Sequence, residues 1–578
     1  MIEKMTKYSW ILLNSDKDSF LENLRGLGIV DIKRSLKPVD GESEKMLVSI
    51  ETLRKRISEI EKGSDDKLVS LQAKKHDLEK EADAVRIWGD FDESKLSELG
   101  LELHFYSCAS KKYDPQWPEL YPLQVVAEEK DTTWFVVVGD NSGFPLKEAG
   151  KPTRPHTEIA GEIASVAAEI GDYTAELASK KDDIPSMKEQ MRSMESDFSL
   201  YLASLKGNSA AEGHLAVYEG FAPTKDDASL AEVFDGMDLV WTASPADVAD
   251  NPPIKLKNNS FSKQFESLTE MYGMPCYNEF DPTIFLSIFF LLFFSMCMGD
   301  AGYGLVLIAV AFFFRSKKSE TGLASLWRLI AILGAGTFVV GIVMGGFFGM
   351  DLTQQSWVPE GLKKIMITGD IQVGGSSYAK QMILSLAIGV LHICLALIMK
   401  AVWAVKKDGF KNSLGAIGWT LLIVGAVIVL SLGLPGVISE SAMKWLIIGI
   451  AGVSAIGIYL FNKWGRNPLK NIGSGLWDTY NMASGLMGDV LSYIRLYALG
   501  LSGSMLGSTF NMMGGMVLGD NPTWQWLPFV LIVIFGHVLN IAMSCLGAFV
   551  HPLRLNFVEF FKNSSYEGAG SAYNPIKK

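Results

Sequence analysis

The sequence predicts a mainly α-helical protein that joins a charged, water-soluble part to a polytopic membrane part. Charged residues dominate residues 1–282, long apolar runs dominate residues 283–560, and two charged segments carry apolar residues at helical spacing. A helix needs about 20 apolar residues to cross the hydrocarbon layer of a membrane, and several of the C-terminal runs reach that length. We therefore expect a cytosolic domain at 1–282, a membrane domain at 283–560 and a cytosolic C-terminal tail at 561–578.

The composition argues against several classes of function. The 578 residues carry a formal net charge of -11, and no basic patch favours a nucleic acid. The five cysteines are scattered without a CxxC spacing, so neither a disulfide framework nor a zinc site is predicted. Residues 143–152 resemble a phosphate-binding loop only loosely, because Pro152 stands where Ser or Thr must meet magnesium. We expect no cofactor and no enzyme activity of the chain by itself.

In the soluble part, two long helices are expected at about 42–85 and 156–205. Leu47, Ile50 and Leu53 recur at helical spacing in the first segment, and methionines form a similar seam in the second. Short apolar stretches around these helices predict strands and hence small α/β lobes. Two charged helices separated by α/β sequence predict an antiparallel coiled coil with a lobe at each end. The alternative is a pair of ordinary amphipathic helices packed on a core.

The membrane part predicts eight passes. Its apolar runs lie at about 283–314, 326–350, 379–403, 412–434, 443–461, 472–517 and 525–560. The first run contains the glycine-rich sequence Gly299–Gly304, so it is one tilted helix or two short ones. Lys and Arg cluster in alternate connections, near 315–328, 406–411 and 463–470, which favours a cytosolic location for these. The N-terminus lacks the apolar core of a signal peptide, so it is also expected in the cytosol. Two passes must then precede residue 315, which makes Gly299–Gly304 a hairpin.

The last two runs are too long for one upright crossing, and each carries an arginine. A straight helix over 472–517 would measure about 70 Å, so we expect both helices to be long and tilted. Arg495 stands in the first of them and Arg554 in the second. An arginine keeps its charge, and placing it at mid-bilayer costs roughly 2.5–3.5 kcal/mol, so it usually faces a water-filled path or a partner carboxylate. Arg554 has a second interpretation, because it stands near a helix end and its side chain could extend to the cytosolic interface.

Four segments of the chain resemble one known family. They are Phe280-Asp-Pro-Thr283, Met298-Gly-Asp-Ala-Gly-Tyr-Gly304, Leu491-Ser-Tyr-Ile-Arg-Leu-Tyr-Ala-Leu-Gly-Leu501 and Phe549-Val-His-Pro-Leu-Arg-Leu-Asn-Phe-Val-Glu559. The chain resembles the membrane subunit of rotary V-type and A-type ATPases, called subunit a in eukaryotes and subunit I in prokaryotes. The resemblance extends over nearly the whole chain, and the length suits a prokaryotic member in the plasma membrane.

The resemblance implies a stator subunit that takes part in ion transport. Arg495 would face the carboxylates of a membrane rotor ring, with Arg554 and His551 close by, and two aqueous half-channels would lead H⁺ or Na⁺ to and from the ring. The candidates for lining these half-channels are polar residues at or near membrane positions: Asp489, Ser492, Tyr493, Ser502, Glu279, Asp281, Asp300 and Glu559. In some members a histidine and a glutamate stand where this chain has Gly503 and Ser544, so no route through such groups is expected here.

The resemblance also implies the partners. The last two transmembrane helices would meet the rotor ring of c/K subunits, and the cytosolic domain would bind peripheral-stalk subunits of the E/G type and the central-stalk connector of the d/C type. One rival is a stand-alone secondary transporter that binds an anion at Arg495, but such proteins often contain internal repeats, and we find none here. A second rival is a membrane-anchored scaffold, which would tolerate the loss of Arg495.

Overall fold

The computed structural model describes residues 1–35, 37–88, 102–129, 131–139, 144–149, 154–210, 214–315, 323–373, 376–433, 438–461, 467–518 and 524–577. The ends of the segment 143–152 and most of the charged connections near 315–328 and 463–470 lie outside these residues. The chain forms two compact units. The first contains Met1–Ile11 and Glu219–Pro575, and the second contains Leu12–Tyr218 and the residues from Ile576 onward. The domain boundaries expected after residues 282 and 560 stay a prediction.

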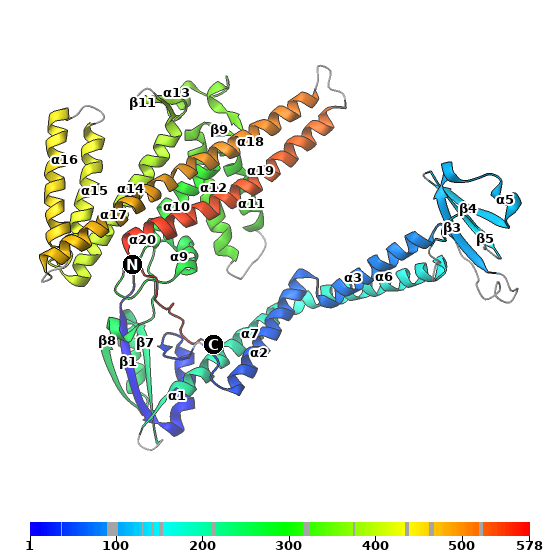
Figure 1. Ribbon diagram of the computed structural model, residues 1–578. Coiled ribbons are helices and arrows are strands. Elements are labelled where there is room, and N and C mark those ends of the chain that lie inside the picture. The colour runs from blue at the N-terminus through cyan, green and yellow to red at the C-terminus, as the bar shows by residue number, and fades with distance from the viewer. Residues whose placement is uncertain are drawn as a thin grey trace. The chain divides into compact units, whose positions relative to one another are not determined.

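Two pairs of long helices form an arm in the second unit (Figure 1). Helix α2 (Gly41–Lys62) packs on α7 (Ile184–Lys206), and α3 (Asp66–Val85) packs on α6 (His156–Ser179). This order of contacts makes the two sides of the arm antiparallel. The helices expected at 42–85 and 156–205 are therefore present, and each is interrupted near its middle. Coiled-coil packing between them stays a prediction.

Within the described residues, two small β-sheets precede the apolar helices in the chain. Strands β3 (Leu103–Ala109), β5 (Thr132–Val138) and β4 (Leu123–Glu129) form a three-stranded sheet in that order, next to the short helix α5 (Trp117–Leu120). Alternate residues of β5, Phe135 and Val137, are buried in its core. A five-stranded sheet has the order β2-β7-β1-β8, with β6 paired to β7. These strands span Asp31–Ile32, Leu215–Pro223, Met5–Leu13, Val240–Pro245 and Asn208–Ala210.

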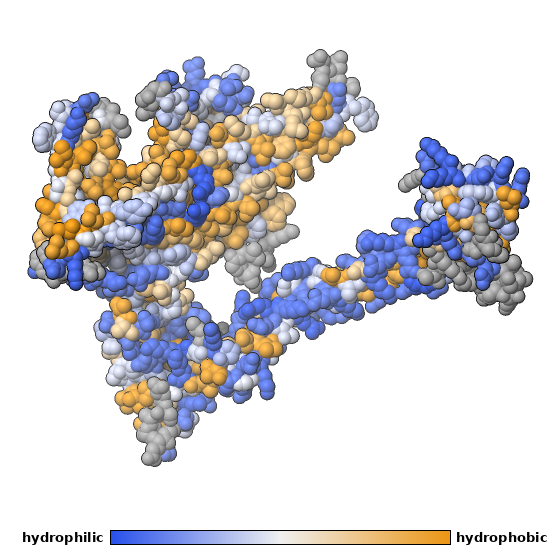
Figure 2. Space-filling view, in the orientation of Figure 1, coloured by the Kyte–Doolittle hydropathy of each residue, from blue (hydrophilic) through white to orange (hydrophobic). Residues whose placement is uncertain are grey.

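The first unit contains the apolar helices, and Figure 2 shows hydrophobic residues over much of their surface. They are α10 (Thr283–Met298), α11 (Ala301–Arg315), α12 (Leu323–Met344), α14 (Lys380–Asp408), α15 (Leu414–Gly433), α16 (Glu440–Ala455), α17 (Pro468–Ser492), α18 (Ile494–Leu518) and α19 (Trp526–Arg554). After α19, a π-helical turn over Leu555–Phe560 leads into α20 (Phe561–Ser564). The chain is thus mainly helical, as the sequence predicts.

Among the described residues, five helices are long and apolar enough to cross a membrane. They span Leu326–Met344, Lys380–Asp408, Leu414–Gly433, Glu440–Leu460 and Trp526–Ser564. Helices α10 and α11 pass the same test only together, which gives up to six spans if the bent pair counts as one. These helices indicate an integral membrane protein. The expected number of eight passes is not confirmed by them.

The first apolar run is broken, as the Gly299–Gly304 sequence suggests. Helices α10 and α11 are bent by 119° relative to each other. Gly299 ends α10 with φ 57°, a left-handed conformation that glycine adopts without steric cost. Asp300 is buried at the bend, and its carboxylate accepts hydrogen bonds from the backbone N–H groups of Tyr303 (3.1 Å), Phe348 (2.8 Å) and Gly349 (2.8 Å). Asp300 therefore ties the bend to the loop after α12.

Small residues let α11 and α12 approach closely. A Cβ atom on Gly341 would lie 2.3 Å from the backbone nitrogen of Ala301, and one on Gly304 would lie 2.5 Å from the backbone nitrogen of Phe338. Both distances are far below van der Waals contact. At these positions the glycines serve backbone-to-backbone packing, as small residues often do between membrane helices.

The run expected at 472–517 is not one helix. It consists of α17 and α18, which are separated at Tyr493, two residues before Arg495. Neither helix is among the described segments that qualify as a membrane span by length and composition. The polar residues of α17 and the small residues of α18 explain this, because they lower the mean hydropathy of both helices.

Candidate functional site

The fold brings Arg495, Arg554 and His551 together. Arg495 stands in the first turn of α18, while His551 and Arg554 stand in the last turn of α19, and the two helices pack on each other. Both arginines lie close enough to His551 to act on it electrostatically. Arg495 and His551 are half-buried, and Arg554 is exposed. The helix that carries Arg495 thus faces the helix that carries the second arginine.

The arginine cluster has no counterion within salt-bridge distance in the described part of the chain. The Nη1 atom of Arg495 is buried without a hydrogen-bond partner there, and so is Nδ1 of His551. Glu559 is near enough to Arg554 to act electrostatically, but the two groups form no salt bridge. A buried guanidinium nitrogen without an acceptor is costly, so the site is suited to receive a carboxylate from outside the described residues.

Tyr493 fixes the break between α17 and α18. Its side chain is fully buried, and its hydroxyl group lies 3.0 Å from Nδ1 of His392 on α14. A Cβ atom on Gly389, one turn earlier in α14, would lie 2.3 Å from the Tyr493 ring. The His392 ring in turn stacks on Phe560, with ring centroids 4.5 Å apart. These contacts anchor the chain two residues before Arg495, so Tyr493 has the surroundings of a positioning residue.

Asp489, Ser492 and Glu559 form a second polar group near the end of α17. The Asp489 carboxylate accepts a hydrogen bond from Nδ2 of Asn563 (2.8 Å) and lies 3.6 Å from Nζ of Lys562. Glu559 is 2% exposed, and its Oε2 atom has no hydrogen-bond partner among the described residues. The Ser492 hydroxyl lies within hydrogen-bonding reach of the Glu559 carboxylate, and Asp489 is close enough to act on it electrostatically. Three of the residues selected from the sequence therefore lie together.

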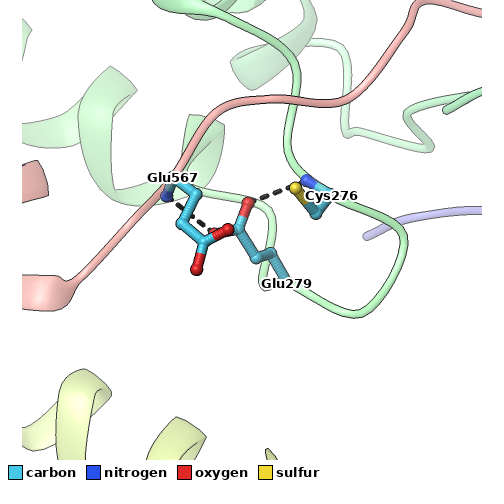
Figure 3. A group of neighbouring side chains, drawn as sticks. All are labelled: Cys276, Glu279 and Glu567. Carbon is cyan, nitrogen blue, oxygen red and sulfur yellow. Dashed lines mark hydrogen bonds between the residues drawn. The ribbon is translucent and has the colours of Figure 1, made fainter. Parts of the chain in front are cut away.

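Two other half-channel candidates, Glu279 and Asp281, make their contacts outside this group. Glu279 accepts hydrogen bonds from the backbone N–H groups of Cys276 and Glu567, each at 2.7 Å, and Figure 3 shows it between these residues. Asp281 pairs with the amino group of Met1 at 2.6 Å and accepts a hydrogen bond from the backbone of Thr283. These contacts hold the segment that leads into α10, and none of them involves an arginine of the cluster. Ser502 is exposed on α18.

The ligand atoms of Cys276, Glu279 and Glu567 lie within 4.8 Å of one another. Burial, reinforced by the neighbouring carboxylates, raises the pKa of the Cys276 thiol. A protonated thiol is a poor metal ligand, because metals bind the thiolate. The backbone hydrogen bonds of Glu279 give this group a structural role.

The structure contains a hydrogen-bonded network between α11, α18 and α19 that the sequence analysis did not predict. The Tyr303 hydroxyl lies 2.9 Å from Nδ1 of His537, whose Nε2 lies 3.0 Å from Oδ1 of Asn511. Asn540 donates to the Tyr303 hydroxyl (2.7 Å) and to the backbone oxygen of Gly503 (2.8 Å). His537 and Asn540 continue the helical face of Ser544, His551 and Arg554 toward the start of α19. That spacing was the signal that could have identified them.

A cavity of about 240 Å³ lies beside α18, beyond Arg495 along the helix. Tyr497, Gly500 and Ser504 line it from α18, and Asp351, Asp370 and Gln381 are among the polar residues opposite. The space is large enough for several water molecules, and its polar groups can bind them. Water could thus reach the part of α18 that follows Arg495.

Comparisons with known proteins show what the chain is similar to. A family model described as the V-type ATPase 116kDa subunit family matches residues 161–350. The chain is 31% identical over 384 residues to the "A-type ATP synthase subunit I" of Methanocaldococcus jannaschii, a match that covers 62% of this chain and 54% of the relative. It is 25% identical over 628 aligned positions to the "V-type ATP synthase subunit I" of Borreliella burgdorferi, a match that covers 100% of both.

A third relative, the "A-type ATP synthase subunit I" of Pyrococcus horikoshii, is 30% identical over 391 residues, covering 65% of this chain and 55% of the relative. The matches thus span about half the length of the two archaeal relatives and the full length of the bacterial one. The family match and the relatives' names agree with the resemblance seen in four sequence segments. The chain is therefore similar to the membrane subunits of V-type ATPases and A-type ATP synthases called subunit a or subunit I, and its residues 161–350 match the model of that family.

Proposed function

We propose that this chain is the ion-translocating stator subunit of a rotary V/A-type ATPase or ATP synthase. One observation carries the proposal: Arg495 is half-buried beside Arg554 and His551, with a buried Nη1 atom that has no acceptor among the described residues. A carboxylate on a rotor subunit would supply that acceptor. The chain itself makes no covalent bond, and ATP chemistry belongs to partner subunits.

A fixed arginine can couple ion movement to rotation by electrostatics. Its permanent charge stabilises the ionised form of each rotor carboxylate that passes, so the carboxylate must release its H⁺ or Na⁺ before it reaches Arg495. The same charge repels a cation that would move directly between the two half-channels. Ions can then cross only while they are bound to the carboxylates of the rotating ring.

The polar groups on the two sides of Arg495 support two half-channels. Asp489, Ser492 and Glu559 would line one of them, and the cavity beside Tyr497 and Ser504 would belong to the other.

We also propose that the chain crosses the membrane eight times. In this count α10 and α11 are separate passes, α17 and α18 together form one tilted pass, and both ends of the chain lie in the cytosol. Asp300 and Tyr493 would then position the helices without carrying the ion.

The arm suits the mechanical task of a stator. Its small lobes would bind peripheral-stalk subunits of the E/G type and the d/C-type connector, and so resist the torque of the rotor. Ion pairs such as Arg154 with Glu81 and Glu162, both at 2.8 Å, link the helices of the arm.

The test is Arg495→Ala in the assembled complex, with ATP-driven ion uptake measured in vesicles. Uptake should fall by more than about tenfold, since that factor corresponds to only about 1.4 kcal/mol and the lost charge interaction exceeds this in a dry site. Arg328→Ala is the matched control, because Arg328 is an exposed arginine on another apolar helix. Normal uptake by an assembled Arg495→Ala complex would reject the stator function and favour a scaffold.

Arg554→Ala separates the two interpretations of the second arginine. A loss of uptake similar to that of Arg495→Ala would mean that Arg554 shares the rotor carboxylate. A small loss would mean that it interacts mainly with the membrane surface, in keeping with its exposed side chain. The stand-alone transporter remains the alternative function, and it predicts uptake by the isolated chain without partner subunits.

A further inference from the structure

Two cavities meet between helices α14, α15, α16 and α17, and neither is lined by Arg495, Arg554 or His551. One has a volume of about 510 Å³ and lies at the turn between α14 and α15. The other, of about 390 Å³, lies between α15, α16 and α17. Trp419, Met482 and Leu486 line both of them, so the two cavities adjoin. Together they form a continuous recess on the side of the apolar helices.

The larger cavity contains charges of both signs. Lys400 and Lys562 contribute ammonium groups to its wall, while Asp408, Asp478 and Asp489 contribute carboxylates. Lys562 lies 3.6 Å from Asp489, and Asp478 is close enough to Lys400 to act on it electrostatically. Asn412, Asn481 and Asn563 add neutral hydrogen-bonding groups. Each cation thus has an acidic neighbour, and the cavity suits a ligand that carries both charges.

The smaller cavity is lined mostly by apolar side chains. Ala451, Ala455 and Ile458 line it from one side, and Leu422, Ile423 and Ala483 line it from the other. Apolar cavities of this kind do not hold water well. In a bilayer, the occupant available to such a space is an acyl chain of a lipid. The adjoining charged cavity would then receive the headgroup of the same molecule.

We propose that this recess binds one phospholipid with a zwitterionic phosphoethanolamine headgroup. Its phosphate lies near Lys400 and Lys562, its ammonium group donates to Asp408 and Asp478, and one acyl chain lies along Leu422 and Ala455. Trp419 stands at the junction of the two cavities, a place that suits an aromatic ring at a membrane interface. Arg495 does not line this site, whereas Asp489 lines it and also belongs to the polar group assigned to a half-channel.

The charge balance selects this headgroup among the common ones. Carboxylates outnumber lysines in the cavity, so an anionic headgroup would add to an excess of negative charge. Phosphocholine has a phosphate and a cation, but its trimethylated nitrogen has no N–H group to donate to a carboxylate. The primary ammonium of phosphoethanolamine has three such groups, as the lysine ammonium does. Only the phosphoethanolamine headgroup satisfies both signs of charge and the hydrogen-bonding groups.

The experiment measures lipid bound to the full chain in detergent by native mass spectrometry. The chain is titrated separately with palmitoyl-oleoyl phosphatidylethanolamine, phosphatidylcholine and phosphatidylglycerol. We expect one tightly bound phosphatidylethanolamine per chain, with an affinity about tenfold above that of either other lipid; a factor of ten is about 1.4 kcal/mol. Equal affinity for the three lipids, or tighter binding of phosphatidylglycerol, would overturn the proposal.

Variants test the two cavities separately. Lys400→Gln should lower the affinity for phosphatidylethanolamine about tenfold, while Lys406→Gln, an exposed lysine later on the same helix, should not. Ala455→Phe should fill the apolar cavity and weaken binding of all three lipids, while Val453→Phe, at an exposed position of α16, should not. Unchanged binding by both Lys400→Gln and Ala455→Phe would place the lipid elsewhere. If a variant fails to fold, the headgroup ranking of the unaltered chain still decides the proposal.

Discussion

Charged side chains in the apolar part of this chain occupy contrasting surroundings. Asp300 is buried but accepts three backbone hydrogen bonds, so its charge is satisfied by the fold. Glu559 is equally buried, and its Oε2 atom has no partner among the described residues. A buried carboxylate oxygen without a donor costs free energy, and proteins keep such groups mainly where function requires them. We therefore expect Glu559 to handle ions and Asp300 to hold structure.

The first prediction concerns Glu559→Gln. ATP-driven uptake should fall about tenfold, because the amide cannot take up or release a proton, while the thermal midpoint should stay equal or rise, because a buried amide costs less than a buried carboxylate. Both quantities are measured on the assembled complex and the purified chain. Glu440→Gln is the control, since Glu440 is an exposed acid at the start of α16. Full uptake by Glu559→Gln would assign Glu559 a structural role.

At the scale of helices, close backbone contact decides how the apolar helices pack. Gly341 on α12 approaches the start of α11, and Gly389 on α14 approaches the Tyr493 ring at the break between α17 and α18. Side chains larger than hydrogen would force these elements apart. The position of Arg495 thus depends on helices that are remote from it in the sequence.

The second prediction is that Gly341→Ala destabilises the chain. The added methyl group would lie 2.3 Å from the Ala301 nitrogen, and overpacking of this kind typically costs about 1–3 kcal/mol. The matched control is Gly449→Ala on α16, where no atom lies within 4 Å of the added group and alanine favours the helix. Thermal unfolding of the purified chain in detergent should show a lower midpoint for the first variant alone. Equal midpoints would mean that α11 and α12 separate easily.

At the scale of the whole molecule, the two compact units contain different kinds of structure. The first contains the apolar helices and all residues of the arginine cluster, and the second contains the charged arm. The three-stranded lobe in the second unit exposes apolar side chains, among them Leu120 at 70% and Val126 at 39%. Exposed apolar groups on a charged domain favour contact with a partner protein.

The third prediction follows from that lobe. Leu120→Asp should lower co-purification of peripheral-stalk subunits with the full chain by about tenfold, since a charge in an apolar contact is poorly solvated there. Val69→Asp on α3 is the control, because Val69 is 56% exposed and lies on the arm itself. Unaltered co-purification, or the same loss in both variants, would show that the lobe is not the contact surface.

Several features of this chain follow from the sequence. Helical spacing identified the long arm helices, and runs of apolar residues identified most of the membrane helices, because both signals are local. Arg495 and Arg554 stood out because a permanent charge in an apolar run is costly. The glycine-rich sequence near Asp300 also revealed the bend, since glycine ends a helix where a left-handed conformation is needed.

Other features were decided by the tertiary structure. The break at Tyr493 depends on contacts with Gly389 and His392, which are about a hundred residues away and leave no local pattern. Glu279 and Asp281 look like membrane acids in the sequence, yet in the fold Glu279 accepts a hydrogen bond from the backbone N–H of Glu567 and Asp281 pairs with the Met1 amino group. A sequence shows which charges need partners; only folding decides which distant groups provide them. That is why the two arginines could be selected from the sequence, while most of the contacts around them could not.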